Sequence, residues 1–238
     1  MFKIRAFWAL SDRETCEAFA EGHRNVLLEN GIKKVTSADN SWMDSPMVYV
    51  FVCEDEEANI VGGARLHIAA ENHPLPMQTA ISQVDQRINT YVEEFSPRGT
   101  AELCGLWNSR KVAGRGIGVK MLPLAAFAIT QDLEINILLA LVAKHTLKQS
   151  LRWGFERFEK VGDQGEFNYP KLDLIATSLI MKDTAHINCK KPADYEMIET
   201  LRNQKIIQKT IPWARGEFEI EIDIRIDQIH WKDYLRNN

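Results

Sequence analysis

Three glycines stand at alternating positions, 114, 116 and 118, between two largely apolar segments. Glycine has no Cβ atom, so a phosphate group can approach the backbone of such a stretch closely. A helix that begins there leaves its first N–H groups without partners, and these groups favour an anion. We therefore predict a strand over residues 101–108, a phosphate-binding loop, and a helix that begins near Val119.

This loop differs from two common phosphate loops. It does not end in Gly-Lys-Ser/Thr, so the residues that hold a γ-phosphate and magnesium are missing. The dinucleotide fingerprint places its glycines early in a series of βαβ units, whereas these glycines lie mid-chain. Arg110, Lys111, Arg115 and Lys120 add positive charge around the turn. A phosphate-bearing cofactor is the prediction, and a glycine-rich turn without a function is the alternative.

The composition is ordinary for a globular protein. Of the 238 residues, 45% are hydrophobic and 26% are charged, enough for one large domain or two small ones. The net charge of −4 argues against general nucleic-acid binding. No apolar run is long enough to cross a membrane, no signal-peptide core follows the N-terminal residues, and the four cysteines are scattered. We expect a cytoplasmic protein with no disulfide, metal site or membrane span.

Strand and helix patterns interleave along the chain. The apolar runs at 47–53 and 60–68 predict a hairpin, and those at 135–142 and 172–181 predict two more buried strands. Helices are expected at 11–31, at 77–95, from the glycine loop to about residue 132, at 147–161 and at 192–204. This order predicts an α/β fold with a mixed sheet.

The last fifty residues have a different pattern. Phe218 and the isoleucines at 220, 222, 224 and 226 alternate with charged residues, mostly acidic. Such alternation predicts a strand with one buried face and one solvated face. This strand could extend the main sheet or pair with a neighbouring chain. We expect a domain of residues 1–185 and a C-terminal extension, 186–238, packed on it as a helix plus this extra strand.

The segment Ala113-Gly114-Arg115-Gly116-Ile117-Gly118 resembles the pyrophosphate loop of the GNAT N-acyltransferase superfamily, which runs Gln/Arg-x-x-Gly-x-Gly. Ala113 stands where that loop usually has Gln or Arg. The resemblance implies a mixed, mostly antiparallel central sheet flanked by helices. It also implies an acyl thioester as the donor substrate.

Further motifs resemble one branch of that superfamily, the acyl-homoserine-lactone synthases and N-acyl amino acid synthases. Residues 24–28 resemble the branch's helix motif Arg-x-x-Val-Phe, with Leu28 in place of the aromatic. Residues 62–66 resemble its strand Gly-x-x-Arg-Leu, and residues 102–103 its Glu-Leu/Ile pair. Asp44 falls where the branch has acidic residues before a long strand. Gly105 and Leu106 stand where the branch has Arg and Phe. Segments 72–77 and 153–162 resemble its later elements.

The resemblance implies a role for each matched residue. The amine of a small molecule would attack the thioester, with Glu102 as the candidate base and Arg65 as its partner or as an acceptor-binding group. An exposed, non-catalytic position is the alternative for both side chains. Arg24 and Asp44 are candidate acceptor-binding residues, although a solvated position suits them equally. The candidate donor-binding residues are Leu106, Trp107, Asn108, Arg110, Gly114, Arg115, Gly116 and Gly118.

The donor could be acyl-CoA or the phosphopantetheine of an acyl-carrier protein. Carrier proteins are acidic, and seven cations could form a basic patch near the loop: Arg110, Lys111, Arg115, Lys120, Lys144, Lys148 and Arg152. The same charges would suit the phosphates of CoA.

Two other classes of function are compatible with the sequence. Gly105 and Ala113 motivate a non-catalytic sensor that binds an acyl thioester or an acyl amino acid. The alternating strand at 217–226 motivates an interaction module that dimerises through a sheet edge.

Overall fold

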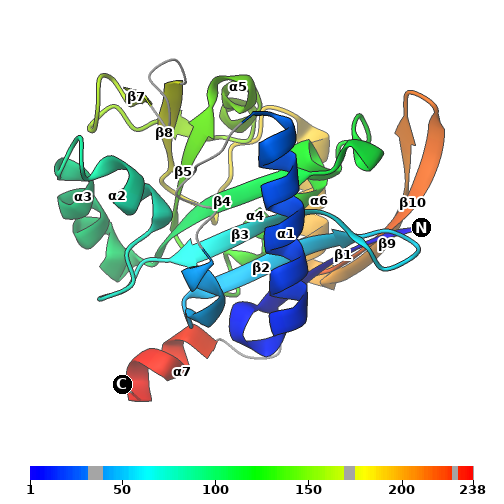
Figure 1. Ribbon diagram of the computed structural model, residues 1–238, viewed down its shortest axis with the longest axis horizontal. Coiled ribbons are helices and arrows are strands. Elements are labelled where there is room, and N and C mark those ends of the chain that lie inside the picture. Colours follow the sequence, from blue (N-terminus) through cyan, green and yellow to red (C-terminus); the bar gives the residue numbers. More distant parts are fainter. Residues whose placement is uncertain (32–39, 169–174, 227–229, 238) are drawn as a thin grey trace.

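The computed structural model describes residues 1–31, 40–168, 175–226 and 230–237 of the chain (Figure 1). Most of its strands join one sheet in the order β6-β8-β5-β4-β3-β2-β1-β10-β9, and β7 pairs with β8. The strands are β1 Phe2–Trp8, β2 Val48–Glu54, β3 Ile60–Ile68, β4 Thr100–Asn108, β5 Ile137–Ala143, β6 Glu156–Arg157, β7 Glu166–Asn168, β8 Ile175–Met181, β9 Ile206–Trp213 and β10 Gly216–Asp223.

Only two neighbouring pairs in this sheet are parallel, β1 with β10 and β4 with β5. The remaining pairs are antiparallel, which confirms the mixed and mostly antiparallel sheet expected from the sequence. The hairpin predicted at 47–53 and 60–68 is confirmed as β2 and β3, with Val48 opposite His67.

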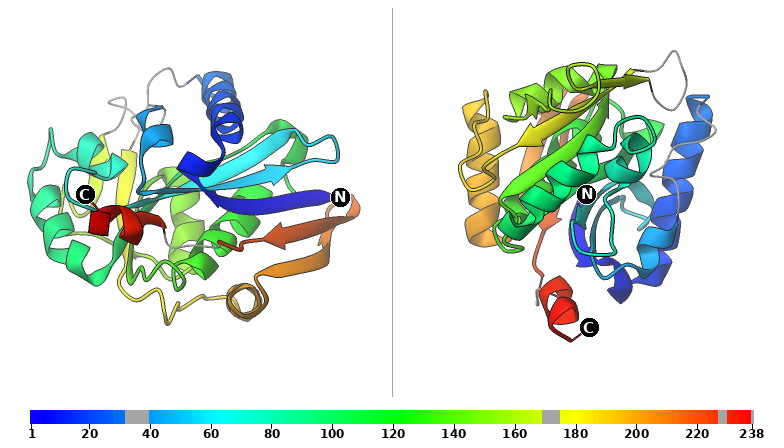
Figure 2. Two further views of the ribbon diagram at one scale, coloured as in Figure 1. Left: turned by 90° about the horizontal axis from the view of Figure 1, so that it is seen from below. Right: turned by 90° about the vertical axis from the view of Figure 1, so that its left-hand side faces the viewer.

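Helices cover both faces of the sheet (Figure 2). On one face lie α1 Arg13–Glu29, α2 Pro76–Ile81 and α3 Arg87–Phe95; on the other lie α4 Leu122–Ile129, α5 Lys144–Arg152 and α6 Pro192–Gln204. A last helix, α7 His230–Asn237, follows at the C-terminal end. Every residue of α4 is buried, because α4 packs between the sheet and α6. Among the described residues, no helix is long and apolar enough to span a membrane.

Several predicted elements differ from the observed ones. The helix expected at 77–95 is two helices, α2 and α3, separated by a turn. The helix expected at 147–161 begins at Lys144 and ends at Arg152; Gly154 takes a positive φ of +99°, which turns the backbone out of the helix, and β6 follows. Pro123 lies in the first turn of α4, where its missing N–H costs nothing.

The C-terminal extension adds two strands rather than one. The alternating strand is β10, whose Ile220 and Ile222 are buried. It lies beside β1, a strand that the sequence analysis missed, and it pairs with β9 as a hairpin at the edge of the sheet. The alternating apolar and charged residues therefore mark a strand that extends the main sheet.

Strands β4 and β5 diverge along their length. They pair only from Thr100 to Glu102 on β4, opposite Ile137 to Leu139 on β5. Beyond Glu102, β4 stays with β3 as far as Asn108, whereas β5 stays with β8. The sheet is thus split from Leu103 onward. The split points toward the glycine loop, which directly follows β4.

Candidate active site

The glycine loop follows a short 3-10 turn, Arg110–Val112, and leads into a π-helical turn, Ile117–Met121. Gly114 and Gly116 have φ values of +80° and +78°, which side-chain-bearing residues rarely adopt, and a Cβ added to Gly114 would meet no atom within 4 Å. The backbone N–H groups of Gly116, Ile117 and Gly118 have no hydrogen-bond acceptor among the described residues. The loop therefore has the open backbone and the free donors that an anion requires.

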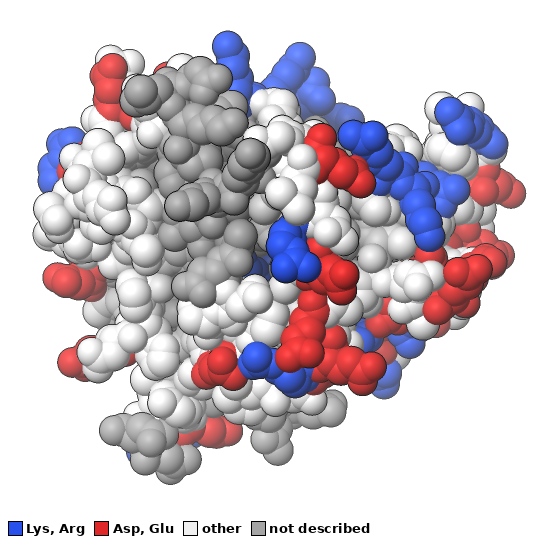
Figure 3. Space-filling model, viewed as in Figure 1, with Lys and Arg blue, Asp and Glu red and all other residues white. Residues whose placement is uncertain are grey.

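Three of the cations near this loop, Arg110, Lys120 and Arg115, contact protein groups. Arg110 Nε lies 3.1 Å from Glu29 of α1, and Lys120 Nζ lies 3.0 Å from the buried Asp194 of α6. The guanidinium of Arg115 lies 4.7 Å from the ring centre of Trp213. Figure 3 shows acidic side chains next to Lys and Arg side chains at the upper right, over the region of the loop. Arg110 and Arg115 thus contact Glu29 and Trp213 in this structure, and their role in binding a phosphate stays a prediction.

The backbone of β4 has free edges along the split. The N–H of Ser109 donates to the carbonyl of Val61 at 2.8 Å, and Trp107 is paired with Gly63. Because alternate residues of an antiparallel strand bond to the same neighbour, Leu106 and Asn108 direct their backbone groups away from β3. These groups face the side from which β5 has departed. They can hydrogen-bond an extended ligand that enters the split.

A β-bulge at Gly105 shapes this edge. The register between β3 and β4 shifts between Gly63 and Arg65. The step of two residues from Gly63 to Arg65 on β3 lies opposite a step of three residues, from Trp107 to Cys104, on β4. Gly105 has φ +57°, and a Cβ on it would lie 2.8 Å from Arg65 Nε. The family's arginine at this position would therefore clash with Arg65. Glycine is required here by conformation and by space.

Replacing Gly105 with alanine should destabilise the protein. The positive φ and the contact with Arg65 together predict a loss of about 1–3 kcal/mol in the free energy of unfolding. Urea unfolding followed by circular dichroism measures this loss. Gly31→Ala is the comparison, because Gly31 has a similar φ of +73° but a Cβ there meets nothing within 4 Å. Equal losses for the two variants would contradict the role of the Arg65 contact.

Glu102 lies at the apex of the split and is only 2% exposed. Its Oε2 accepts a hydrogen bond from the backbone N–H of Met77 at 2.7 Å. Burial raises the pKa of this carboxyl to about 8, although the Met77 bond and the charge of Arg65 act in the opposite direction. A carboxyl with this pKa can take up and release a proton near neutral pH. The alternative of an exposed Glu102 is wrong.

Arg65 is also buried, at 1% exposure. Its guanidinium lies 4.4 Å from the ring centre of Trp42 and 5.6 Å from that of Phe19. These rings hold the side chain over the face of the sheet that α1 covers. The interpretation of Arg65 as an outward-pointing residue is therefore wrong.

A pocket of about 360 Å³ opens on the same face of the sheet. Asp44 and Trp42 line it from a 3-10 turn, Ser41–Asp44, and Arg65 and His67 line it from β3. Its remaining lining residues are Ser41, Ser45, Met47, Ile68, Asn72, His73, Pro74, Pro76 and Thr79. Polar and aromatic groups thus converge on a space suited to a small molecule.

His67 is a site residue that the sequence analysis missed. It is 8% exposed, it pairs across the strands with Glu102, and its Nε2 has no hydrogen-bond partner among the described residues. Burial and the charge of Arg65 lower the pKa of this imidazole well below its usual value, so it is neutral at pH 7. The alternation of strand β3 was the available signal, because it places residues 65 and 67 on one face.

The structure separates the other predicted residues. Asp44 reaches the pocket, where its Oδ1 accepts a hydrogen bond from Arg13 Nη1 at 2.7 Å. Arg24 is exposed on α1 and does not line the pocket. The Trp107 side chain is in the core beneath α1, 5.8 Å from Phe19 between ring centres. A Cβ on Gly118 would lie 2.1 Å from Asn108 Oδ1, so the end of β4 and the loop pack directly together.

The Cys104 thiol also lies in this region, paired across the strands with Arg65. Burial raises the pKa of the Cys104 thiol, which lies on β4 near Arg65 of β3, to about 12. A thiol with this pKa is protonated and unreactive at neutral pH. In the part of the chain that the structure describes, no group of three or more His, Cys, Asp or Glu could hold a metal ion.

Comparison with known proteins identifies the fold. No protein-family model and no curated protein matches the sequence. Among solved structures, FeeM, an N-acyl amino acid synthase from uncultured soil microbes, is similar with a TM-score of 0.58 and 14% identity over 76% of this chain and 91% of that one. BjaI, a CoA-dependent acyl-homoserine lactone synthase, has a TM-score of 0.55 and 14% identity over 99% of this chain and 100% of that one. A second CoA-dependent acyl-homoserine lactone synthase, MesI, has a TM-score of 0.54 and 14% identity over 90% of this chain and 100% of that one.

Proposed function

We propose that this chain, which has the fold of the GNAT N-acyltransferases, transfers an acyl group from a thioester to the amine of a small molecule. The observation that carries the proposal is the buried Glu102 at the apex of the split between β4 and β5. Glu102 lies where the strand edge suited to a donor begins, and its cross-strand partner His67 lines the pocket suited to an acceptor.

The donor would lie along β4. The N–H groups of Gly116, Ile117 and Gly118 would hold its phosphate, and the backbone of Leu106 and Asn108 would bond its extended arm. Six residues of extended strand separate Asn108 from Glu102, which corresponds to about 20 Å. A long, flexible arm between phosphate and thioester is the feature that acyl-CoA and the phosphopantetheine of an acyl-carrier protein share. BjaI and MesI are described as CoA-dependent.

Glu102 would act as the base. It accepts a proton from the acceptor's amine while the nitrogen bonds to the thioester carbon, and the carbon–sulfur bond then breaks. The protonated Glu102 then returns that proton to the departing sulfur, so the products are an amide and a free thiol, and Glu102 is again a carboxylate. A backbone N–H on the free edge of β4 would stabilise the charge that develops on the carbonyl oxygen.

The pocket would bind the acceptor. Asp44 at its wall favours a cationic amine, and the buried Arg65 favours an acceptor with a carboxylate or another anionic group. Of the neighbours, FeeM is described as an N-acyl amino acid synthase. An autoinducer-synthase-like activity, in the cytoplasm, is the finer form of this proposal.

Thiol release tests the proposal. Purified protein is mixed with acyl-CoAs of several chain lengths and with a panel of amino acids and other small amines, and the free thiol is measured with a disulfide reagent. We expect amine-dependent release for at least one pair. Binding of acyl-CoA without release for any acceptor would favour the non-catalytic sensor.

The rate should depend on pH through Glu102. A base must be deprotonated to act, so the rate at saturating substrate should rise with pH and level off above about 8, the pKa to which burial raises this carboxyl. Stopped-flow measurement of thiol release between pH 6 and 9.5 would show this profile. A rate that is flat across this range would contradict the assignment.

A further inference from the structure

We propose that the C-terminal hairpin of β9 and β10 positions the phosphate loop through Arg115. This inference rests on the proposed function, since it assigns to the hairpin a part in donor binding. Arg115 and the aromatic residues of the hairpin are then positioning residues that act through the backbone of the loop.

Arg115 stands between the two glycines of the loop that have positive φ. Its guanidinium lies 4.8 Å from the ring centre of Phe2, 4.7 Å from that of Trp213 and 5.9 Å from that of Phe218. Its Nε is buried and has no hydrogen-bond partner among the described residues. A cation held against three rings is a specific contact, and here it joins the middle of the loop to the hairpin.

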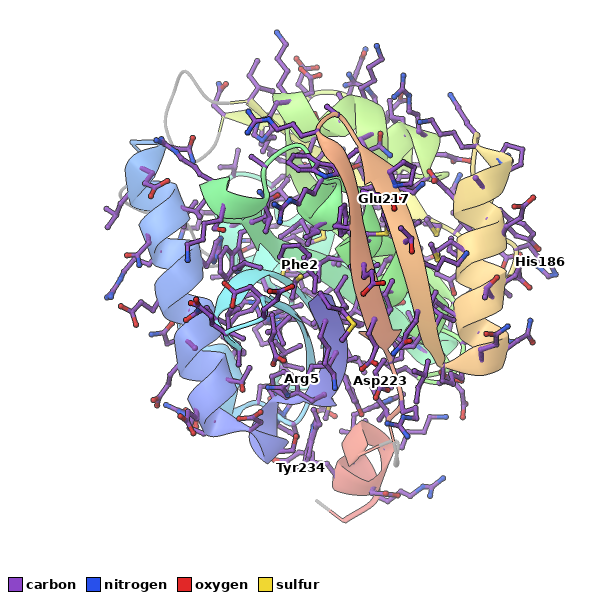
Figure 4. All side chains as sticks on the ribbon, turned by 90° about the vertical axis from the view of Figure 1, so that its right-hand side faces the viewer. Phe2, Arg5, His186, Glu217, Asp223 and Tyr234 are labelled. Atoms are coloured by element: carbon purple, nitrogen blue, oxygen red, sulfur yellow. The ribbon has the colours of Figure 1, made fainter. Side chains whose placement is uncertain are left out.

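The hairpin is firmly attached to the sheet. Residues 2–5 of β1 pair with residues 220–223 of β10, and the rings of Phe2 and Phe218 meet edge to face at 5.6 Å. Figure 4 shows the tip of the hairpin, where Glu217 is labelled, beside the turns that follow β4. The rings that hold Arg115 are therefore themselves fixed.

A second contact joins the extension to the same unit. Lys120, in the turn after the loop, lies 3.0 Å from Asp194 of α6, and Asp194 is 1% exposed. At the far end of α4, Lys205 Nζ donates to Asp132 Oδ1 at 2.7 Å. The extension thus holds the loop and the helix that follows it at several points.

These contacts explain why the loop can bind an anion with its nearby cations otherwise occupied. Backbone N–H groups bind a phosphate only when their directions converge, and two glycines with free φ would let them diverge. The hairpin, through Arg115, removes that freedom before the donor arrives. Its contribution is therefore to affinity for the donor.

Trp213→Leu tests the inference without altering the loop. Calorimetry measures CoA binding, and hydrogen exchange measures protection of the amides of residues 113–119. We expect CoA to bind about tenfold more weakly and these amides to exchange faster. In the acylation assay, KM for the acyl-CoA should rise by the same factor while kcat stays the same. Thr210→Ala, on the opposite and exposed face of the same strand, is the matched control.

Arg115→Lys is the second variant, and it keeps the charge but loses the planar group. It should weaken CoA binding as Trp213→Leu does, and the double variant should be no weaker than either single one. Unchanged CoA binding and unchanged exchange in Trp213→Leu would overturn the inference. A wild-type protein that does not bind CoA would overturn the proposed function instead, and the exchange data would still decide whether the hairpin holds the loop.

Discussion

Replacing Glu102 with glutamine should lower kcat for acyl transfer by about 100-fold or more, with little change in KM. Positioned general bases contribute about 10²–10⁴ to a rate, and the amide of glutamine cannot accept the proton. Its carbonyl oxygen can still accept the hydrogen bond from Met77, so the pocket and the turn into α2 keep their geometry. Steady-state thiol release with saturating donor and acceptor measures the effect.

Glu93→Gln is the control for this variant. Glu93 is exposed on α3, so the same change of charge and shape there should leave kcat unaltered. The pH profile of the residual activity gives a second check, because the rise toward pH 8 should disappear in Glu102→Gln. Full activity in this variant would remove Glu102 from the mechanism.

The same substitution should stabilise the protein at alkaline pH. The pKa of Glu102 is raised from 4.5 to about 8 in the folded protein. Between these values the native state holds a proton that the unfolded chain has lost, so this group makes the free energy of unfolding fall as pH rises. Above about pH 8 the loss is on the order of 4 kcal/mol, and a neutral glutamine avoids it.

Urea unfolding of both proteins at pH 5 and pH 9 measures this difference. Other carboxyl groups titrate equally in the two proteins, so the gap between them isolates residue 102. We expect Glu102→Gln to be clearly more stable than the wild type at pH 9 and close to it at pH 5. A gap that does not change with pH would mean that the carboxyl is not held protonated by burial.

Both predictions concern Glu102, whose carboxyl has opposite effects on activity and on stability. A carboxyl in a buried position lowers stability where it is charged, and the same burial brings its pKa into the range useful for a base. Protein sites that perform proton transfer commonly show this conflict between stability and activity.

The sequence by itself determined the local features of this protein. Short apolar runs indicated β2, β3, β5 and β8, which are buried, and the alternation of apolar and charged residues indicated β10, which is half-buried. The three glycines indicated a phosphate loop, since their backbone conformations and lack of Cβ atoms are local properties. The resemblance of short motifs then indicated the fold, which the structural comparisons support.

The tertiary structure decided which side chains meet. Strand β1 was missed because its pairing partners, β2 and β10, are far away in the sequence. Strand β9 lies at the sheet edge, and Lys209 and Pro212 interrupt its apolar pattern. Helices α2 and α3 were merged because the turn between them has no strong local signal. The loop's cations looked free for a phosphate, but Glu29, Asp194 and Trp213 occupy them from distant elements. The burial of Glu102 and Arg65, and the place of His67 beside them, depend on α1 and α2 covering one face of the sheet. Contacts between distant segments fix burial, and burial fixes the pKa values on which the proposed chemistry depends.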